Sequence, residues 1–342
     1  MPERLATVLG TGLLGASVGL ALRSQGWTVN GWDPDPEALN GAGQRGAIGT
    51  ALSTPNVAGS DLVVLASPPD AMISTLSDLE WDGLVTDIAG VKTPIVAAAA
   101  HLPHFVGGHP MAGGETSGPA MASRSMFHGA TWVLTSDGSH PDDLATMSDV
   151  VTSFGANPLV MTAAEHDAAV ARVSHLPHVL ASALIGLAAS DPKALGLAGG
   201  GFRDLTRIAG SESHWWTEVL RANSSQVGEA IDELQTALET WRELISTGSA
   251  PDLAGRLDSA RESRAALSEH HTQVRVVLLD RPGEIARVGH ALEQSRVDVR
   301  DFQLRHGEHG GGGILTISVK GSGKDALTMA LVDEGFEVRI DG

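Results

Sequence analysis

The sequence predicts an α/β protein in three successive parts: a doubly wound parallel sheet, an all-helical segment and a ferredoxin-like βαββαβ unit. Three observations support this fold class. Short apolar strands alternate with helical stretches in the first part, apolar residues then recur at helical spacing, and strands return near the C-terminus. The chain has 342 residues, enough for two or three domains. We expect domains at 1–161, 162–270 and 271–342.

Six apolar strands are expected to form the parallel sheet of the first part. A helix over Leu13–Ser24 follows the first strand, and Gly, Pro and Asp residues occupy the gaps between later elements. Strands that alternate with helices in this way lie parallel, because a crossover helix connects each strand to the next. The expected strands are Leu5–Leu9, Thr28–Trp32, Leu62–Ala66, Leu84–Ile88, Phe105–Gly107 and Thr131–Leu134.

A glycine-rich motif, Gly10–Gly15, separates the first strand from its helix. There the first glycine permits a tight turn, the second lets the backbone approach a pyrophosphate, and the third allows close packing, as in Rossmann-type domains. Asp33 ends the second strand, where a carboxylate binds the ribose 2′-hydroxyl, and Asp35 would repel the 2′-phosphate of NADP. We therefore predict NAD as the cofactor. The expected contacts are Gly10, Gly12, Leu13, Leu14, Gly15, Asp33 and Ser67.

The middle part has the apolar spacing of helices. Between Trp215 and about Ile245 apolar residues repeat every seventh position, which predicts a helix with an apolar side about 45 Å long. A small domain alone cannot bury such a side, so we expect an all-helical dimerisation domain in a homodimer; the alternative is packing on neighbouring helices. Arg256–Ser268 is expected to be a charged, solvated helix. The repeated residues are Leu220, Val227, Leu234 and Trp241.

The last part shows the element order strand, helix, strand, strand, helix, strand, which is typical of ferredoxin-like units. Thr272 begins this part. The expected strands are Val274–Leu279, Val297–Leu304, Ile314–Val319 and Val338–Ile340, and the expected helices are Glu284–Ser295 and Lys324–Glu334.

Composition limits the classes of partner and chemistry. The 23 Lys and Arg against 41 Asp and Glu give a net charge of −18, which argues against nucleic acid and acidic membrane surfaces. There is no Cys and no Tyr, which excludes disulfides, thiolate metal sites and a tyrosine acid, and nothing else suggests a metal. No run approaches about 18 uninterrupted apolar residues, and the N-terminus lacks the pattern of a signal peptide. We expect a cytoplasmic protein.

Two further clusters carry polar side chains suited to chemistry. His109 follows a short apolar strand, so we expect it at the carboxyl edge of the sheet, where ligands bind in this architecture. An imidazole there can remove a hydroxyl proton as hydride leaves the same carbon, although a His-Pro turn is more often only a turn. An arginine behind the triple-glycine loop Gly199–Gly201 can clamp a carboxylate.

Four motifs taken together resemble the prephenate/arogenate dehydrogenase family of tyrosine biosynthesis, along essentially the whole chain. The resemblance implies NAD-linked oxidative decarboxylation of a small dianionic substrate. That substrate is prephenate, giving 4-hydroxyphenylpyruvate, or arogenate, giving tyrosine directly; the sequence leaves this choice open. The motifs are GTGLLG (Gly10–Gly15), GHPMAGGETSG (Gly108–Gly118), SHLPH (Ser174–His178) and GGGFRDLTRIA (Gly199–Ala209).

The resemblance also assigns roles to particular residues. His109 matches the catalytic histidine, Arg207 the arginine that binds a substrate carboxylate, and His178 a second pocket histidine. One position departs from the family: a serine that often supports the catalytic histidine is replaced by Gly90, so another group or a water must orient His109. Lys92 would add positive potential near the substrate or be a solvated lysine. The residues that match pocket or gate positions are Glu115, Asp204 and Trp216.

The C-terminal part resembles an ACT domain, with Asp280–Glu284 at its first strand–helix turn. This resemblance implies a possible tyrosine effector at that turn; the alternative is a purely structural domain. Two other functions remain open from the sequence. One is a different Rossmann-plus-helical enzyme of the β-hydroxyacid dehydrogenase type, and the other is a non-catalytic NAD sensor.

Overall fold

The computed structural model describes residues 4–113, 118–266, 271–279, 281–306 and 312–340. The chain divides into two compact units, Met1–Ala237 and Leu238–Gly342. The first unit contains a parallel sheet and most of the helices of the middle part, and the second contains the end of the helical middle part followed by an antiparallel sheet with two helices.

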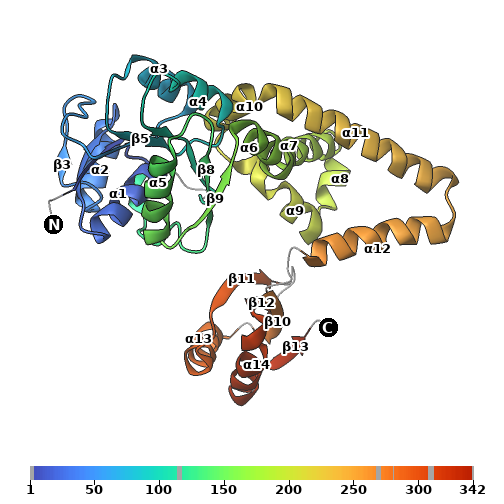
Figure 1. Cartoon of the computed structure of the whole chain (residues 1–342). Helices are drawn as coiled ribbons and strands as arrows, with labels where there is room; N and C mark the ends of the chain where they lie inside the picture. The colour runs from blue at the N-terminus through green and yellow to red at the C-terminus, as the bar shows by residue number, and fades with distance from the viewer. Residues whose placement is uncertain (1–3, 114–117, 267–270, 280, 307–311, 341–342) are drawn as a thin grey trace. The chain divides into compact units, whose positions relative to one another are not determined.

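A parallel six-stranded sheet forms the centre of the first unit (Figure 1). Its strand order, β3-β2-β1-β4-β5-β6, is the Rossmann order and places the carboxyl ends of β1 and β4 side by side. Five of the expected strands are confirmed, and the two-residue β3 was not expected. The strands are β1 (Leu5–Leu9), β2 (Thr28–Trp32), β3 (Thr50–Ala51), β4 (Leu62–Leu65), β5 (Leu84–Asp87) and β6 (Phe105–Val106).

Helices cover both faces of this sheet, which explains the continuous apolar runs of its strands. In β4, Leu62 and Val64 belong to one core, whereas Val63 and Leu65 belong to the other. The helices are α1 (Leu13–Ser24), α2 (Pro36–Gln44) and α5 (Pro141–Ser153) over the first core, and α3 (Pro69–Asp78) and α4 (Thr93–Ala98) over the second.

One expectation about the sheet is wrong. Thr131–Leu134, as β8 (Thr131–Thr135), belongs to a separate three-stranded sheet, antiparallel to β7 (Gly108–Pro110) and parallel to β9 (Asn157–Met161). The chain passes from β6 into β7 with no crossover helix, and a parallel neighbour in the main sheet would need one. His109 therefore follows β6, as expected, but lies on a strand of the second sheet.

Three connected helical segments begin the middle part: α6 (Ala163–Val170), a π-helical turn η2 (Ala171–His175) and α7 (Leu176–Ala189). Thr162 caps α6 in a reciprocal capping box with Glu165. The π turn precedes Pro177, which has no N–H to continue the regular α-helical bonds. Shorter elements follow: α8 (Pro192–Gly196), α9 (Gly200–Thr206) and the 3₁₀ turn η3 (Arg207–Gly210).

The single long helix expected from Trp215 to Ile245 is interrupted at Asn223. The structure has α10 (Ser213–Ala222), α11 (Ser224–Thr247) and, further on, α12 (Ala250–Ala266). Asn223 departs from helical backbone angles, and its side chain Nδ2 donates to the carbonyl of Asp167, 2.9 Å away. The heptad repeat spans this break, so the continuous 45 Å face is wrong; the 24 residues of α11 extend for about 36 Å.

One helix among the described residues, Ala163–Ala189, is long and apolar enough to cross a membrane by length and composition. Only 28% of its most apolar window is buried, and core helices of soluble proteins pass the same test. Large apolar side chains on it, including Val173, Leu180 and Leu187, are exposed in the single chain.

The C-terminal part has the expected βαββαβ element order. Its antiparallel sheet has the order β11-β12-β10-β13, and α13 and α14 pack on each other. The core contains Val274, Val276, Leu315 and Ile317. The elements are β10 (His271–Leu278), α13 (Glu284–Ser295), β11 (Val299–His306), β12 (Gly313–Lys320), α14 (Lys324–Asp333) and β13 (Glu337–Ile340).

Candidate active site

The glycine-rich turn after β1 has a different constraint at each glycine. Gly10 has a φ of +100°, and a Cβ on it would lie 2.5 Å from the carbonyl oxygen of Ala66. A Cβ on Gly15 would lie 2.0 Å from the carbonyl oxygen of Gly10, whereas one on Gly12 would meet nothing within 4 Å. The first and third glycines are thus required by packing, and the second leaves open space at the beginning of α1.

Asp33 connects the end of β2 to this turn. Its Oδ2 accepts from the backbone N–H of Thr11 at 2.6 Å and from the Thr11 hydroxyl at 3.2 Å, and its Oδ1 accepts from the N–H of Asp35 at 2.9 Å. Ser67 lies on the other side of the turn, directly after Ala66. Leu13 and Leu14 are the first residues of α1. The expected cofactor contacts therefore surround one turn at the carboxyl ends of β1, β2 and β4.

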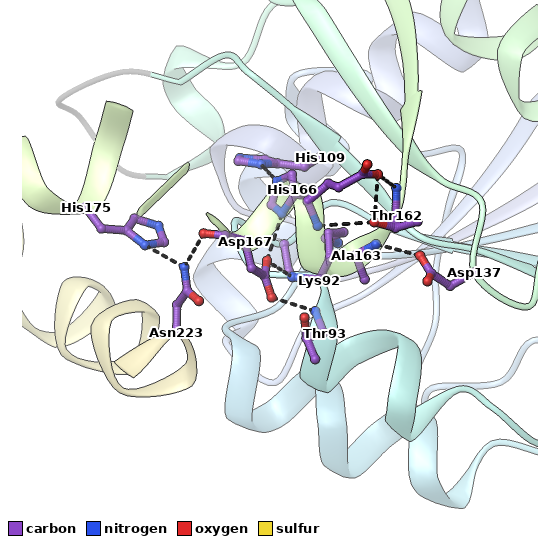
Figure 2. A network of polar contacts seen from close by, with 12 residues as sticks. Lys92, Thr93, His109, Asp137, Thr162, Ala163, His166, Asp167, His175 and Asn223 are labelled. Atoms are coloured by element: carbon purple, nitrogen blue, oxygen red, sulfur yellow. Dashed lines mark hydrogen bonds and ion pairs between the residues drawn. The ribbon is translucent and has the colours of Figure 1, made fainter. Parts of the chain in front are cut away.

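His109 is half-buried on β7 and contacts a second histidine. Its Nδ1 lies 2.8 Å from Nε2 of His166 on α6, with the two rings edge to face (Figure 2). On the opposite side of the ring, a Cβ on Gly90 would lie 3.7 Å from His109 Nε2 and 3.9 Å from Trp215. One ring nitrogen of His109 is therefore engaged by protein, and the other faces a residue with no side chain.

His166 is in turn held by Asp167. The Nδ1 of His166 lies 2.8 Å from Oδ1 of Asp167, and both side chains are buried. The same carboxylate accepts from the backbone N–H groups of Lys92 at 2.7 Å and Thr93 at 2.8 Å, at the beginning of α4. These hydrogen bonds lower the pKa of Asp167 even though burial opposes them. Asp167 is therefore a carboxylate fixed at a helix N-terminus.

Lys92 is not the solvated lysine that one reading of the sequence offered. Its side chain is completely buried, so it is not solvated, and its ammonium pairs with the equally buried Asp87. The ammonium also donates to the carbonyl oxygen of Gly108 at 2.6 Å, and the N–H of Gly108 donates to Asp87 Oδ1 at 3.0 Å. The ion pair thus holds the backbone immediately before His109. Burial lowers the pKa of Lys92, and the Asp87 charge opposes that shift.

Three imidazoles of this region are kept neutral. Burial lowers the pKa of His109 well below its usual 6.5, and repulsion from His166, Lys92 and His175 adds to the shift. Burial likewise lowers the pKa of His175 to about 4, and that of His178 below its usual value. A neutral imidazole at His109 can accept a proton at physiological pH.

His178 stacks on Trp216, with ring centroids 3.8 Å apart and planes 10° apart. The buried Nδ1 of His178 has no hydrogen-bond partner among the residues that the structure describes. Trp216 also contacts Trp215 edge to face, and Trp215 borders Gly90 beside His109. The two tryptophans thus connect the two histidines predicted for the pocket.

Two of the other predicted pocket residues lie on elements that contact α7. Asp204 and Arg207 have exposed side chains on α9 and η3, and η3 packs against α7, which carries His178. Glu115 lies outside the described residues.

Sequence reasoning missed four residues of the network: His166, Asp167, His175 and Asn223. Asn223 Nδ2 lies 3.1 Å from His175 Nδ1 while it donates to the Asp167 carbonyl. The adjacent His-Asp pair at the beginning of an apolar helix was the available signal. His166 is 57 positions from His109 in the chain, so no local pattern connects them.

Comparison with known protein families gives matches for the sheet-containing N-terminal part and for the helical middle part of the chain. The model for "Prephenate dehydrogenase, nucleotide-binding domain" matches residues 18–160, and that for "Prephenate dehydrogenase, dimerization domain" matches residues 162–259. The prephenate dehydrogenase of Lactococcus lactis subsp. cremoris is 31% identical over 280 residues, 77% of each chain. That of Bacillus subtilis is 28% identical over 335 residues, 90% of each chain.

Two solved structures are also similar. Prephenate dehydrogenase from Aquifex aeolicus, in complex with hydroxyphenyl propionate and NAD⁺, is 27% identical with a TM-score of 0.72, over 78% of this chain and 99% of that one. Synechocystis arogenate dehydrogenase is 29% identical with a TM-score of 0.68, over 77% and 99%. The match with the Lactococcus enzyme and the two family models give the same result: this chain belongs to the prephenate dehydrogenase family.

Proposed function

We propose that the chain catalyses the NAD-dependent oxidative decarboxylation of prephenate to 4-hydroxyphenylpyruvate. The observation that carries this proposal is the neutral, half-buried His109, whose Nε2 faces the side-chain-free Gly90. A base in this position, at the carboxyl end of β6, suits the removal of a hydroxyl proton. The names of the curated relatives support the same reaction.

The turn after β1 fits NAD. The space next to Gly12 and the first N–H groups of α1 suit a pyrophosphate, and Asp33 brings a carboxylate to the place expected for the ribose hydroxyls. Asp35, two residues after Asp33, disfavours a 2′-phosphate. When bound, NAD supplies the hydride acceptor.

His109 then has a defined task. Its Nε2 accepts the proton of the ring hydroxyl while hydride leaves the carbon that bears it, which produces a carbonyl. Cleavage of the bond to CO2 sends its electron pair through the ring to that oxygen, which takes the proton back from His109. The aromatic phenol provides the driving force, so the protein has to supply positioning and a base.

For the remaining pocket residues we propose the roles that the family resemblance gives them. Arg207 binds a substrate carboxylate, and the unpartnered Nδ1 of His178 suits a hydrogen bond to substrate. Asp204, Trp216 and Glu115 line or gate the pocket.

Arogenate is the second candidate substrate, because the similar Synechocystis structure is an arogenate dehydrogenase. The two substrates differ by a ketone against an ammonium on the side chain. Steady-state NADH formation with each substrate, by the full-length chain, tests the proposal. We expect turnover with CO2 and NADH released in equal amounts, and kcat/KM on prephenate above that on arogenate. Absence of turnover with both would refute the proposed function.

We further propose a homodimer formed through the middle part. The exposed apolar side chains of α7 and α11, among them Leu187, Leu238 and Ile245, need a cover, and the matched family model is a dimerization domain. Sedimentation equilibrium should give twice the mass of 35.4 kDa. Leu187→Asp should shift the population towards monomer, because it places a charge among the exposed apolar side chains of α7. A wild-type chain that sediments as a monomer would contradict the proposal.

For the last part we propose an ACT-like domain that binds tyrosine, with domain boundaries at 1–161, 162–270 and 271–342. The βαββαβ order and the antiparallel sheet support this proposal. Asp280, in the expected effector turn, lies outside the described residues. Kinetics with and without tyrosine, on the full chain and on a chain ending near His271, should show inhibition of the full chain alone. The cytoplasmic location stays a prediction.

A further inference from the structure

The hydrogen-bonded row Asp167–His166–His109 connects the two halves of the first unit. His109 comes from the second sheet, and the other two residues come from the beginning of α6 (Figure 2). Each contact in the row is 2.8 Å long, and the side chains of His166 and Asp167 are 1% and 3% exposed. A buried row of this length and geometry fixes the protonation state of its members.

The carboxylate end determines where each proton lies. Asp167 is an acceptor, because two backbone N–H groups already donate to its carboxylate, so the contact with His166 requires a proton on His166 Nδ1. In the neutral form of His166, Nε2 then carries no proton and can only accept. The contact between the two histidines therefore requires a proton on His109 Nδ1, and this leaves His109 Nε2 as the unprotonated nitrogen.

We propose that His166 and Asp167 are positioning residues for His109, which hold it in the Nδ1–H tautomer and support the positive charge that develops when Nε2 takes the substrate proton. This inference rests on the proposed function, since it assigns the base atom of that reaction. It also answers the question raised by Gly90, because orientation comes from the Nδ1 side of the ring and needs no side chain on the Nε2 side.

The row is anchored at both ends. Asp167 is held by the backbone of Lys92 and Thr93, and the Lys92 ammonium holds the carbonyl oxygen of Gly108, next to His109. One lysine thus contacts both ends, through its backbone N–H and through its side chain. This closed arrangement restricts the orientations of the His109 ring. A base that is already held in the reactive orientation acts more efficiently.

The charged and titratable groups around His109 come from three elements. Lys92 lies at the beginning of α4, His166 and Asp167 lie on α6, and His175 lies in η2. Burial lowers the pKa of His109, repulsion from His166, Lys92 and His175 adds to that shift, and among these groups only Asp167 raises it. Removing the Asp167 charge should therefore lower this pKa further and weaken the base.

The first test reads the tautomer without reference to activity. Two-bond ¹H–¹⁵N correlation spectra of the full-length chain with ¹⁵N-labelled histidine distinguish Nδ1–H from Nε2–H, and His109→Asn identifies the His109 signals. We expect His109 as Nδ1–H in the wild type and a loss of that preference in Asp167→Asn. An Nε2–H tautomer in the wild type would overturn the proposal.

The second test is kinetic. Asp167→Asn should lower kcat by about 10²–10⁴-fold, shift the acidic limb of the kcat–pH profile to lower pH, and leave the KM values for substrate and NAD nearly unchanged. His166→Gln retains an oxygen that can accept from His109 and should exceed the kcat of His166→Leu about 10-fold. Equal kcat values for these two variants, each at its pH optimum, would contradict the positioning role. The comparison of His166→Gln with His166→Leu also tests the positioning role if Asp167→Asn folds poorly.

The matched control is Asp143→Asn. Asp143 Oδ2 lies 2.8 Å from Nδ1 of His104, the same kind of pair as Asp167 with His166 but outside the site. Its kcat should stay within about 2-fold of wild type. An Nδ1–H tautomer without turnover of prephenate or arogenate would refute the proposed function alone, whereas turnover with an Nε2–H tautomer would refute the positioning row alone.

Discussion

Asp87 and Lys92 form an ion pair in which both side chains are completely inaccessible to solvent. The pair links the end of β5 to the beginning of α4 and holds Gly108 from both its N–H and its carbonyl side. Buried charges of this kind are costly to separate, because the remaining partner has no solvent. The pair therefore ties the stability of the first unit to the position of the site.

Breaking the pair from one side should be strongly destabilising. Lys92→Met leaves the Asp87 carboxylate buried and unpaired, and we expect a loss of about 3–5 kcal/mol in the free energy of unfolding. Adding Asp87→Leu should recover part of the loss, because it removes the orphaned charge. Urea denaturation of the two single variants and the double variant measures the coupling, and strictly additive losses would contradict a direct interaction.

Stability should decline on the acid side of neutrality. Folding lowers the pKa of His175 to about 4, largely by burial, whereas in the unfolded chain it is near 6.5. The unfolded chain therefore binds more protons in this window, so the contribution of His175 is complete above pH 6.5 and is lost as the pH falls towards 4. The Asn223 amide can donate a hydrogen bond to Nδ1 of His175 only when that nitrogen carries no proton. This contact therefore also favours neutral His175.

His175→Gln is expected to reduce this pH dependence. Unfolding free energies measured by urea between pH 7 and pH 4 should fall less steeply in the variant than in wild type, by about 1–3 kcal/mol over the whole window. Identical slopes in the two proteins would show that His175 does not contribute.

Substrate affinity should depend on Arg207. A hydrogen bond to a charged group is worth about 1.5–3 kcal/mol, so Arg207→Gln should raise KM for prephenate roughly 10-fold or more. Arg203→Gln, an exposed arginine one helical turn earlier on α9, is the control and should change KM by less than about 2-fold. Equal effects of the two substitutions would remove the basis for assigning Arg207 to the substrate.

Cofactor choice should depend on Asp33. Asp33→Asn keeps an oxygen for the Thr11 N–H but loses the charge, so the turn should survive while the preference for NAD falls. We expect the ratio of kcat/KM with NAD to that with NADP to drop about 10-fold. An unchanged ratio would refute the assignment of Asp33 to the ribose.

The spacing of apolar residues, together with the Gly, Pro and Asp residues between elements, predicted most of the secondary structure. The glycine turn, α1 and α13 were identified because each is encoded locally, by the spacing of apolar residues and by the glycine that precedes each helix. The assignment of β8 to the main sheet failed because sheet membership depends on the connections between strands. The break at Asn223 was missed because the heptad spacing of apolar residues contains no information on long-range hydrogen bonds. The Asn223 side chain donates to the carbonyl of Asp167, which is far away in the sequence.

The site was predicted in part. Motifs identified His109, His178 and Trp216, and the structure brings the last two into a stack. His166 and Asp167 were missed because they are separated from His109 by more than fifty residues and meet it only after folding. The absence of a side chain at Gly90 was visible in the sequence, but the contact of His109 with His166 was visible only in the three-dimensional arrangement.

We propose His109 as the base of an NAD-dependent dehydrogenase, and two measurements on the same His109→Asn preparation separate its role in catalysis from cofactor binding. The kcat for prephenate should fall about 10²–10⁴-fold, while the Kd for NAD, measured on the same preparation, stays within about 2-fold of wild type. Retention of the wild-type kcat by this variant would contradict the assignment of His109 as the base.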